Sequence, residues 1–268
     1  MTRIKAFSIH LLLTVSIFST FLAIAFLIWY PWPYFETENA PRVLRILVGV
    51  DVVLGPLLTL IIFKPGKPGL KFDIAMIAFV QFAALAYGAS VMFEGRPGYI
   101  AFTVDRFTVI PARDIDDSKL PYPELRTGIL KRPNLIYVRQ PSDPGERYRI
   151  LEEIFQGGPD LDARPEYYEP VAEHREEVLK SAQPVRALFG DSDQKRAVVE
   201  HFAAKHALKP DDIRYLPLVG KDRDMAMILE NVTGSVLGAV DLDPWYRSEL
   251  TGSSAEDDSI RAENAVSP

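Results

Sequence analysis

Cysteine is the most informative absence from this chain of 268 residues. Without cysteine there can be no disulfide, no thiolate metal site and no cysteine nucleophile. Clustered basic charge is also missing, because 30 Lys and Arg stand against 36 Asp and Glu and the formal net charge is -6. A protein that grips nucleic-acid phosphates needs a basic patch, so we expect no nucleic-acid partner.

The common catalytic and metal-binding patterns are missing as well. His201 and His206 are five residues apart. That spacing is roughly 140° around a helix, so the two rings cannot share one metal ion. Gly234-Ser235-Val-Leu-Gly238 sets the serine directly after the glycine, unlike the Gly-x-Ser-x-Gly of a hydrolase. We therefore expect no enzyme, no metal site and no cofactor.

Apolar residues are concentrated in the first third of the chain, in segments 6–30, 46–63 and 72–93. Each is close to the roughly 20 residues that an α-helix needs to cross a bilayer core about 30 Å thick. The first segment is too long for a signal peptide and lacks a small-residue cleavage site, so we interpret it as an uncleaved anchor. The aromatic and proline run WYPWPY at its far end is typical of a membrane–water boundary. Residues 1–95 are thus predicted to form a membrane domain of transmembrane helices.

The distribution of Lys and Arg in the short loops predicts the orientation of these helices, because such residues favour the cytoplasmic side. The N-terminus and the 64–71 loop carry basic residues, whereas the loop between the first two segments carries Glu36 and Glu38 and has Arg42 and Arg45 near its end. The basic residues on the first side are Arg3, Lys5, Lys64, Lys67 and Lys71. We therefore expect a cytoplasmic N-terminus and place everything after Gly95 on the outer side.

Asp51 is an acidic residue inside the second apolar segment. A charged side chain in the middle of a membrane helix costs at least about 2.5 kcal/mol on insertion scales, so Asp51 needs a partner. Counted from about Ile46 at 1.5 Å per residue, Asp51 lies about 7 Å below the outer boundary, at nearly the same depth as Tyr87. Three partners remain open: the Tyr87 hydroxyl, the kinked backbone near Pro56, and a basic group on another protein.

Two further features suggest a groove between the second and third segments. Pro56 has no N–H and its ring crowds the carbonyl of Val52, so the helix is predicted to bend near Gly55. In the third segment, Ala84 and Gly88 form a small-xxx-small pair that permits close helix approach. These residues either pack the helices on one another or form a docking face for a partner helix. The candidate partner-binding residues are Asp51, Gly55, Pro56, Gln81, Ala84, Tyr87 and Gly88.

Residues 96–246 have the mixed composition of a globular domain, and we expect an α+β fold with an antiparallel sheet. Alternation predicts a β-hairpin over 100–109 and a closing meander. Tyr148, Leu151, Ile154 and Phe155 share one helical face. The expected later elements are helices over 171–179 and after Asp191, then strands over 213–219, 225–230 and 235–242. Residues 247–268 have almost no apolar content and are predicted to be a disordered acidic tail.

Several stretches of the chain resemble a known family. The stretches VDVVLGPLLTLIIFKPGKPGLKFD, VQFAALAYG, GRPGYIAFTVDRFTVI and PLVGKDRDMAMILENVTGSVLGAVDLDPW resemble the type IV pilin accessory proteins of the TfpX/TfpZ kind. The resemblance extends to about Trp245. It implies a protein of the inner membrane of a Gram-negative bacterium, with a periplasmic outer domain, that helps a particular pilin reach the pilus. It also implies a pilin client whose positive N-terminal amine could pair with Asp51.

Two classes of function compete at this stage. In the first, the protein is a non-catalytic assembly factor whose membrane helices hold the apolar N-terminal helix of the major pilin while the outer domain touches the pilin head. In the second, it is a sensor or structural subunit of an envelope complex, and its outer domain binds a small ligand. The first interpretation accounts for both the membrane part and the outer part of the chain.

The predicted orientation can be tested with reporter fusions. Alkaline phosphatase is active only outside the cytoplasm, so a fusion after Trp245 should be active and a fusion after Lys67 should be inactive. The reverse pattern would overturn the topology.

Overall fold

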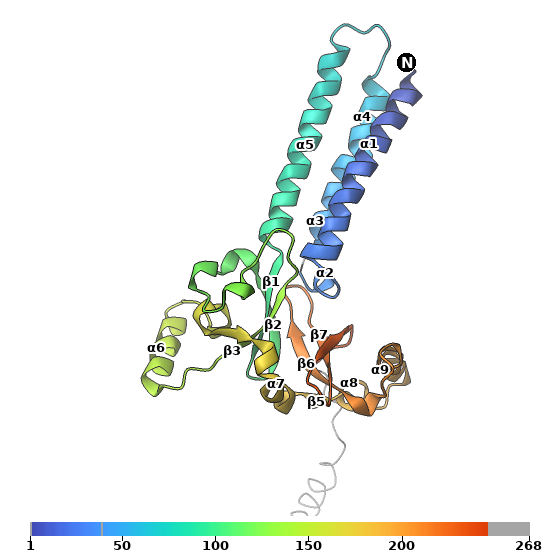
Figure 1. The fold of residues 1–268 in the computed structure, drawn as a ribbon. Helices are drawn as coiled ribbons and strands as arrows, with labels where there is room; N and C mark the ends of the chain where they lie inside the picture. The colour runs from blue at the N-terminus through green and yellow to red at the C-terminus, as the bar shows by residue number, and fades with distance from the viewer. Residues whose placement is uncertain (1, 39, 246–268) are drawn as a thin grey trace, which may run out of the picture.

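The computed structural model describes residues 2–38 and 40–245, so the predicted tail over 247–268 lies outside the described residues. Three helical spans lead into a mixed domain with an eight-stranded sheet. The predicted class, apolar helices followed by an α+β domain, is confirmed. Figure 1 shows the spans side by side, with the N-terminus and the loop between the second and third spans at the end remote from the sheet.

Each span is one continuous apolar helix, although two of the spans change helix type along their length. The first consists of α1 (Arg3–Ile24) and the π-helix η1 (Ala25–Trp29). The second consists of α3 (Ala40–Leu47), the π-helix η2 (Val48–Leu54) and α4 (Gly55–Ile62), and the third is α5 (Leu70–Glu94). The second span packs against both of the others: α1 lies along α4, and α5 contacts α3, η2 and α4.

The domain that follows the spans, called the outer domain after its predicted orientation, is built on one sheet with the strand order β4-β3-β1-β2-β6-β7-β8, and β5 pairs with β6 beside this path. The hairpin of β1 and β2 and the meander of β6, β7 and β8 are antiparallel, as predicted. Two pairings are parallel and were not predicted: β1 with β3, and β2 with β6. The strands are β1 (Pro97–Thr103), β2 (Arg106–Pro111), β3 (Asn134–Val138), β4 (Tyr168–Pro170), β5 (Gln183–Pro184), β6 (Ile213–Val219), β7 (Met225–Glu230) and β8 (Val236–Val240).

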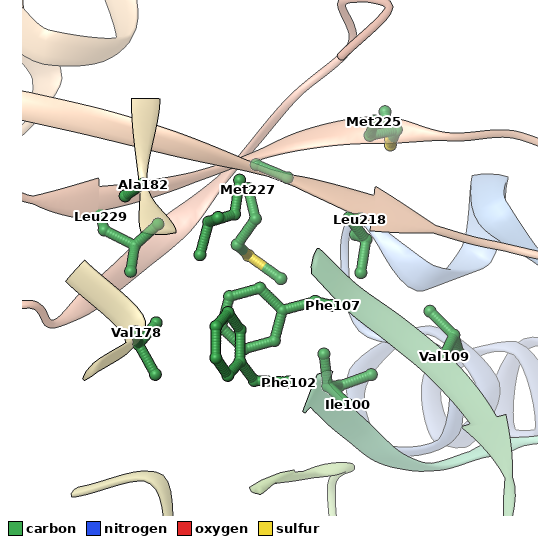
Figure 2. Close-up of a cluster of buried hydrophobic side chains, with 12 residues drawn as sticks. Ile100, Phe102, Phe107, Val109, Val178, Ala182, Leu218, Met225, Met227 and Leu229 are labelled. Atoms are coloured by element: carbon green, nitrogen blue, oxygen red, sulfur yellow. The ribbon is translucent and has the colours of Figure 1, made fainter. Parts of the chain in front are cut away.

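The join between β2 and β6 is short, with only Phe107 opposite Leu218 and Thr108 opposite Val219. A hydrophobic cluster lies across this join and holds the two halves of the sheet together. Figure 2 shows the Met227 side chain directed at the rings of Phe102 and Phe107, which meet edge to face with centroids 5.4 Å apart. Burial of such side chains contributes about 1.5–3 kcal/mol each, so this cluster compensates for the few hydrogen bonds of the join.

Helices cover the sheet, and one of these helices keeps a stripe of apolar side chains exposed to solvent. The helices of the outer domain are α6 (Pro144–Phe155), α7 (Arg175–Ser181), α8 (Arg186–Phe189) and α9 (Asp193–Lys205). In α6 the buried residue is Ile150, whereas Tyr148, Leu151 and Phe155 of the predicted helical face are exposed. The helix expected over 171–179 begins later, at Arg175, because Val171–Glu173 forms a separate 3-10 turn.

The loop between the first two spans is docked into the outer domain. It contains the short helix α2 (Tyr34–Thr37). The N–H of Asp222 donates to the Thr37 carbonyl over 2.9 Å, and the N–H of Lys221 donates to Glu38 Oε1 over 3.0 Å. A Cβ on Gly220 would lie 2.5 Å from the Thr37 side chain, so glycine is needed for this approach. The loop therefore joins the membrane helices to the turn between β6 and β7.

Glu38 makes this joint sensitive to pH. Burial raises the pKa of Glu38 from its ordinary value of 4.5 to about 7, and the nearby Asp222 adds to this, while the Lys221 N–H and charge oppose it. A raised pKa means that the docked state binds the proton more tightly than the unfolded state does. The contribution of Glu38 to stability is therefore full below about pH 4.5 and is lost as the pH rises through 7.

We expect the melting temperature of the detergent-solubilised protein to fall between pH 5.5 and pH 8 by more than that of Glu38→Gln. The Glu38 contribution corresponds to roughly 2–3 kcal/mol in the free energy of unfolding. Differential scanning fluorimetry across this range measures it, and Glu36→Gln, which removes a charge from the same loop, is the control. Parallel pH profiles for the parent and Glu38→Gln would contradict the prediction.

Candidate partner-binding site in the membrane helices

The second span contains a π-helical segment immediately before Pro56. In η2 the N–H of Gly55 donates to the carbonyl of Val50, five residues back. In this register the next donor would be the N–H of Pro56, which proline lacks, and its acceptor would be the carbonyl of Asp51. Pro56 was predicted to leave the Val52 carbonyl without its usual donor. The carbonyl that lacks this donor is instead that of Asp51, because a π register reaches one residue further back than an α register.

Gln81 supplies the missing donor. Its Nε2 donates to the Asp51 carbonyl over 2.9 Å, from α5 to η2. A Cβ on Gly55 would lie 1.9 Å from that Nε2, so only glycine leaves room for the amide. In lipid no water replaces a lost backbone partner, and for that reason this side chain completes the second span.

The Asp51 carboxylate is buried without any compensating contact. Its side chain is 3% exposed. Neither of its oxygens, nor Gln81 Oε1, has a hydrogen-bond partner among the described residues. Buried acceptors without donors cost roughly 1–3 kcal/mol each. Three such acceptors at one level of the bundle form a site that favours a proton or a cationic donor.

The structure does not bring Tyr87 to Asp51. Tyr87 is 73% exposed, and a hydrogen bond from its hydroxyl to Asp51, one of the three possibilities left open by the sequence, is absent among the described residues. The depth argument was wrong because the second span begins at Ala40 instead of Ile46. At 1.5 Å per residue Asp51 lies about 17 Å from that outer end. Tyr87 lies only about 10 Å from the end of α5, whereas Gln81 lies about 20 Å from it and is level with Asp51.

Among the remaining groove residues, some contact the neighbouring helix and others lie at the edge of the site. A Cβ on Gly88 would lie 2.3 Å from a Leu47 methyl group, so the expected close approach of the helices occurs at Gly88. Pro56 is buried, and Ala84 is half-buried. The structure thus gathers Asp51, Gly55 and Gln81 into one site, with Pro56 beside it and Gly88 further out.

One polar contact between spans was missed by sequence reasoning. His10 Nδ1 lies 2.5 Å from Thr59 Oγ1, which ties α1 to α4. The available signal was that His10 is the only His, Lys, Arg, Asp or Glu in segment 6–30, as Asp51 is in segment 46–63. Polar residues inside apolar segments pair preferentially with one another. Among residues 2–38 and 40–245, no group of three or more His, Cys, Asp or Glu could hold a metal ion.

The family model that matches this chain is that of the fimbrial assembly protein FimB, over residues 1–38. The serogroup I fimbrial assembly protein of Dichelobacter nodosus is 29% identical over 245 residues, covering 89% of this chain and 95% of that protein. The fimbrial assembly protein of serogroups C1 and C2 of the same organism is 32% identical over 120 residues, covering 44% of this chain and 91% of that protein. No solved structure is significantly similar to this chain.

The role of Gly55 can be tested by substitution. Gly55→Ala should displace the Gln81 amide and destabilise the protein by roughly 2–4 kcal/mol, through overpacking and the lost hydrogen bond. Gly49→Ala is the matched control, because Gly49 lies in the π-helix η2 that ends just before Gly55, and nothing lies within 4 Å of its Cβ position. Thermal unfolding in detergent and the steady-state amount in membranes report the difference. Equal behaviour of the two variants would refute the packing argument.

Proposed function

Because this chain belongs to the family of fimbrial assembly proteins, we propose that it assists fimbrial assembly by binding a type IV pilin as its client. It is a membrane-associated protein with three apolar helices, as expected of such a factor. The proposal includes the narrower likeness to the TfpX/TfpZ accessory proteins, a location in the bacterial inner membrane and a periplasmic outer domain. It also assigns the protein no catalytic step.

The observation that carries the proposal is the set of unsatisfied acceptors on Asp51 and Gln81. A soluble core rarely tolerates such groups, and a membrane core offers no water to satisfy them. A client helix that brought an ammonium or another donor to this level would remove their cost. The favourable free energy of binding would then come from hydrogen bonds to acceptors that have no partner in the free protein. The N-terminal amine of the client is the donor we assign to Asp51.

Access to Asp51 requires a rearrangement, since the side chain is covered in the free protein. The π-helix η2 is the element suited to it, because a π segment lies one residue out of register with the α-helix on either side. A change of register would rotate Asp51 toward the groove. The second span contacts both of the others, so a client inserted there would touch the whole bundle.

The outer domain offers a second contact for the client. Tyr148, Leu151 and Phe155 form an exposed stripe along α6, with exposed fractions of 71%, 53% and 89%. Exposed aromatic side chains of this kind mark protein interfaces. The stripe borders a pocket of about 690 Å³ that Leu151 helps to line. We propose that the pilin head rests on this stripe while the pilin helix occupies the membrane site.

The pocket beside α6 is also the one observation that favours the alternative, a ligand-sensing subunit. Its volume lies within the roughly 300–1,000 Å³ of small-molecule sites, and its rim carries Arg106, Arg147 and Asp160. The two functions differ in what touches Phe155. A sensor would leave this residue without a protein partner related to fimbriae.

A photocrosslinking amino acid at Tyr87 or Phe155 separates the two functions. Both positions are exposed, at 73% and 89%, so the substitution leaves the core intact. We expect both to capture the fimbrial subunit in living cells, identified by mass spectrometry. Capture of no fimbrial protein from either position would contradict the proposal.

Asp51→Asn tests the role of the carboxylate. It keeps the shape of the side chain but removes the charge, so crosslinking to pilin should fall by roughly tenfold or more while the protein accumulates normally. Asp73→Asn is the control, because Asp73 lies in the first turn of α5 and pairs with Lys67 over 2.6 Å. Reduced protein levels would instead assign Asp51 to helix packing. Normal levels with normal crosslinking and piliation would exclude both roles.

A further inference from the structure

A cavity lined by both charged and apolar side chains lies where the ends of the membrane helices meet the outer domain. Its volume is about 220 Å³. Ala40 of the second span and Met92 of the third line it, together with Tyr30 and Gly95, which directly follow the first and third spans, and Lys221 of the outer domain. The hydroxyl of Tyr30 donates to the Met92 carbonyl over 2.8 Å and fixes this wall. The cavity is therefore at the level of the bilayer surface.

The cavity separates opposite charges instead of neutralising them. Glu38, which is 5% exposed, lines it together with Arg42, Arg113 and Lys221. Glu38 Oε1 accepts the Lys221 backbone N–H, and Oε2 has no hydrogen-bond partner among the described residues. Within residues 2–38 and 40–245, neither arginine forms an ion pair with Glu38, and the ion pair of Arg113 is an exposed contact of 3.4 Å with Asp114. An acid and several cations thus remain available to one ligand.

This arrangement fits a ligand that carries a phosphate and a primary ammonium together. Guanidinium groups bind phosphate oxygens through paired hydrogen bonds, and a carboxylate accepts hydrogen bonds from an ammonium. Because burial raises the pKa of Glu38, a cationic donor beside it would compensate a costly anion. The volume is below the roughly 300–1,000 Å³ of sites for drug-sized ligands, which suits a headgroup.

We propose that this cavity is a phospholipid site that binds the headgroup of phosphatidylethanolamine. Basic pockets between membrane helices hold lipid headgroups elsewhere, and the position at the ends of the spans leaves the acyl chains in the bilayer. The bound headgroup clamps the loop that carries Glu38 against the start of α3 and the end of α5. The inference is independent of the proposed function, because it uses only the membrane helices and their junction with the outer domain.

Native mass spectrometry of the full-length protein in dodecyl maltoside tests the site. Phosphatidylethanolamine, phosphatidylcholine and phosphatidylglycerol are added separately at equal concentration, and the bound lipid is counted. We expect phosphatidylethanolamine to bind roughly tenfold more tightly than phosphatidylcholine, because a quaternary ammonium donates no hydrogen bond to Glu38. Free phosphoethanolamine at the same concentration should not compete, since it lacks the acyl chains.

Variants locate the site. Glu38→Gln keeps an acceptor for the Lys221 N–H and should abolish the preference for ethanolamine over choline. Arg42→Gln should weaken the binding of both lipids by roughly tenfold, since one charge-assisted contact to the phosphate is lost. Arg45→Gln is the matched control, because Arg45 is also exposed and on α3 but does not line the cavity. Arg42 is exposed, so its variant folds even where Glu38→Gln does not.

Four results would overturn the proposal. Equal binding of the ethanolamine and choline lipids to the parent would remove the role of Glu38. Equal effects of Arg42→Gln and Arg45→Gln would reduce the site to a general basic surface, as would preferential binding of phosphatidylglycerol. Effective competition by free phosphoethanolamine would identify a soluble ligand in place of a lipid.

Discussion

The hydrogen bond from Gln81 to the carbonyl of Asp51 is the constraint on which the membrane bundle depends. It exists because Pro56 cannot donate and because lipid cannot replace the missing donor. Gly55 is required next to it, since any side chain there would occupy the space of the amide. This contact and the close approach at Gly88 hold the second and third spans together. The hydrogen bond also sets the π register that puts Asp51, Gly55 and Thr59 on the buried face of the second span.

A second set of contacts makes the outer domain follow these helices. Tyr30 ties the end of the first span to the end of the third, and the next residues of the loop bond to the turn between β6 and β7. That turn leads directly into strands that carry the hydrophobic cluster of the sheet. The membrane helices and the sheet are thus connected through one backbone hydrogen bond and two bonds that involve the side chains of Tyr30 and Glu38.

Periodicity predicted the apolar segments, the β1–β2 hairpin and the closing meander, because each of these depends on neighbours in sequence. The pairings of β1 with β3 and of β2 with β6 depend on strands far apart in the chain, so no local pattern could show them. The start of the second span was predicted at Ile46, with Arg42 and Arg45 assigned to the end of the preceding loop, whereas the helix begins at Ala40. Both are exposed near its outer end, where long basic side chains reach the interface. Because the depth of Asp51 was underestimated, Tyr87 was placed at its level in the third span, although Gln81 lies there.

In these membrane helices, buried polar residues without partners indicate a docking site, whereas exposed apolar residues do not. Phe72, Phe79 and Phe82 on α5 are each about two-thirds exposed or more. In a bilayer they face lipid, which solvates them well, so their exposure creates no demand for a partner. Asp51 and Gln81 are different, because lipid cannot satisfy an acceptor. Only a proton, a water or a donor from another chain can do so. In this bundle the few unsatisfied oxygens, and not the wide apolar surface, therefore favour the binding of a protein partner.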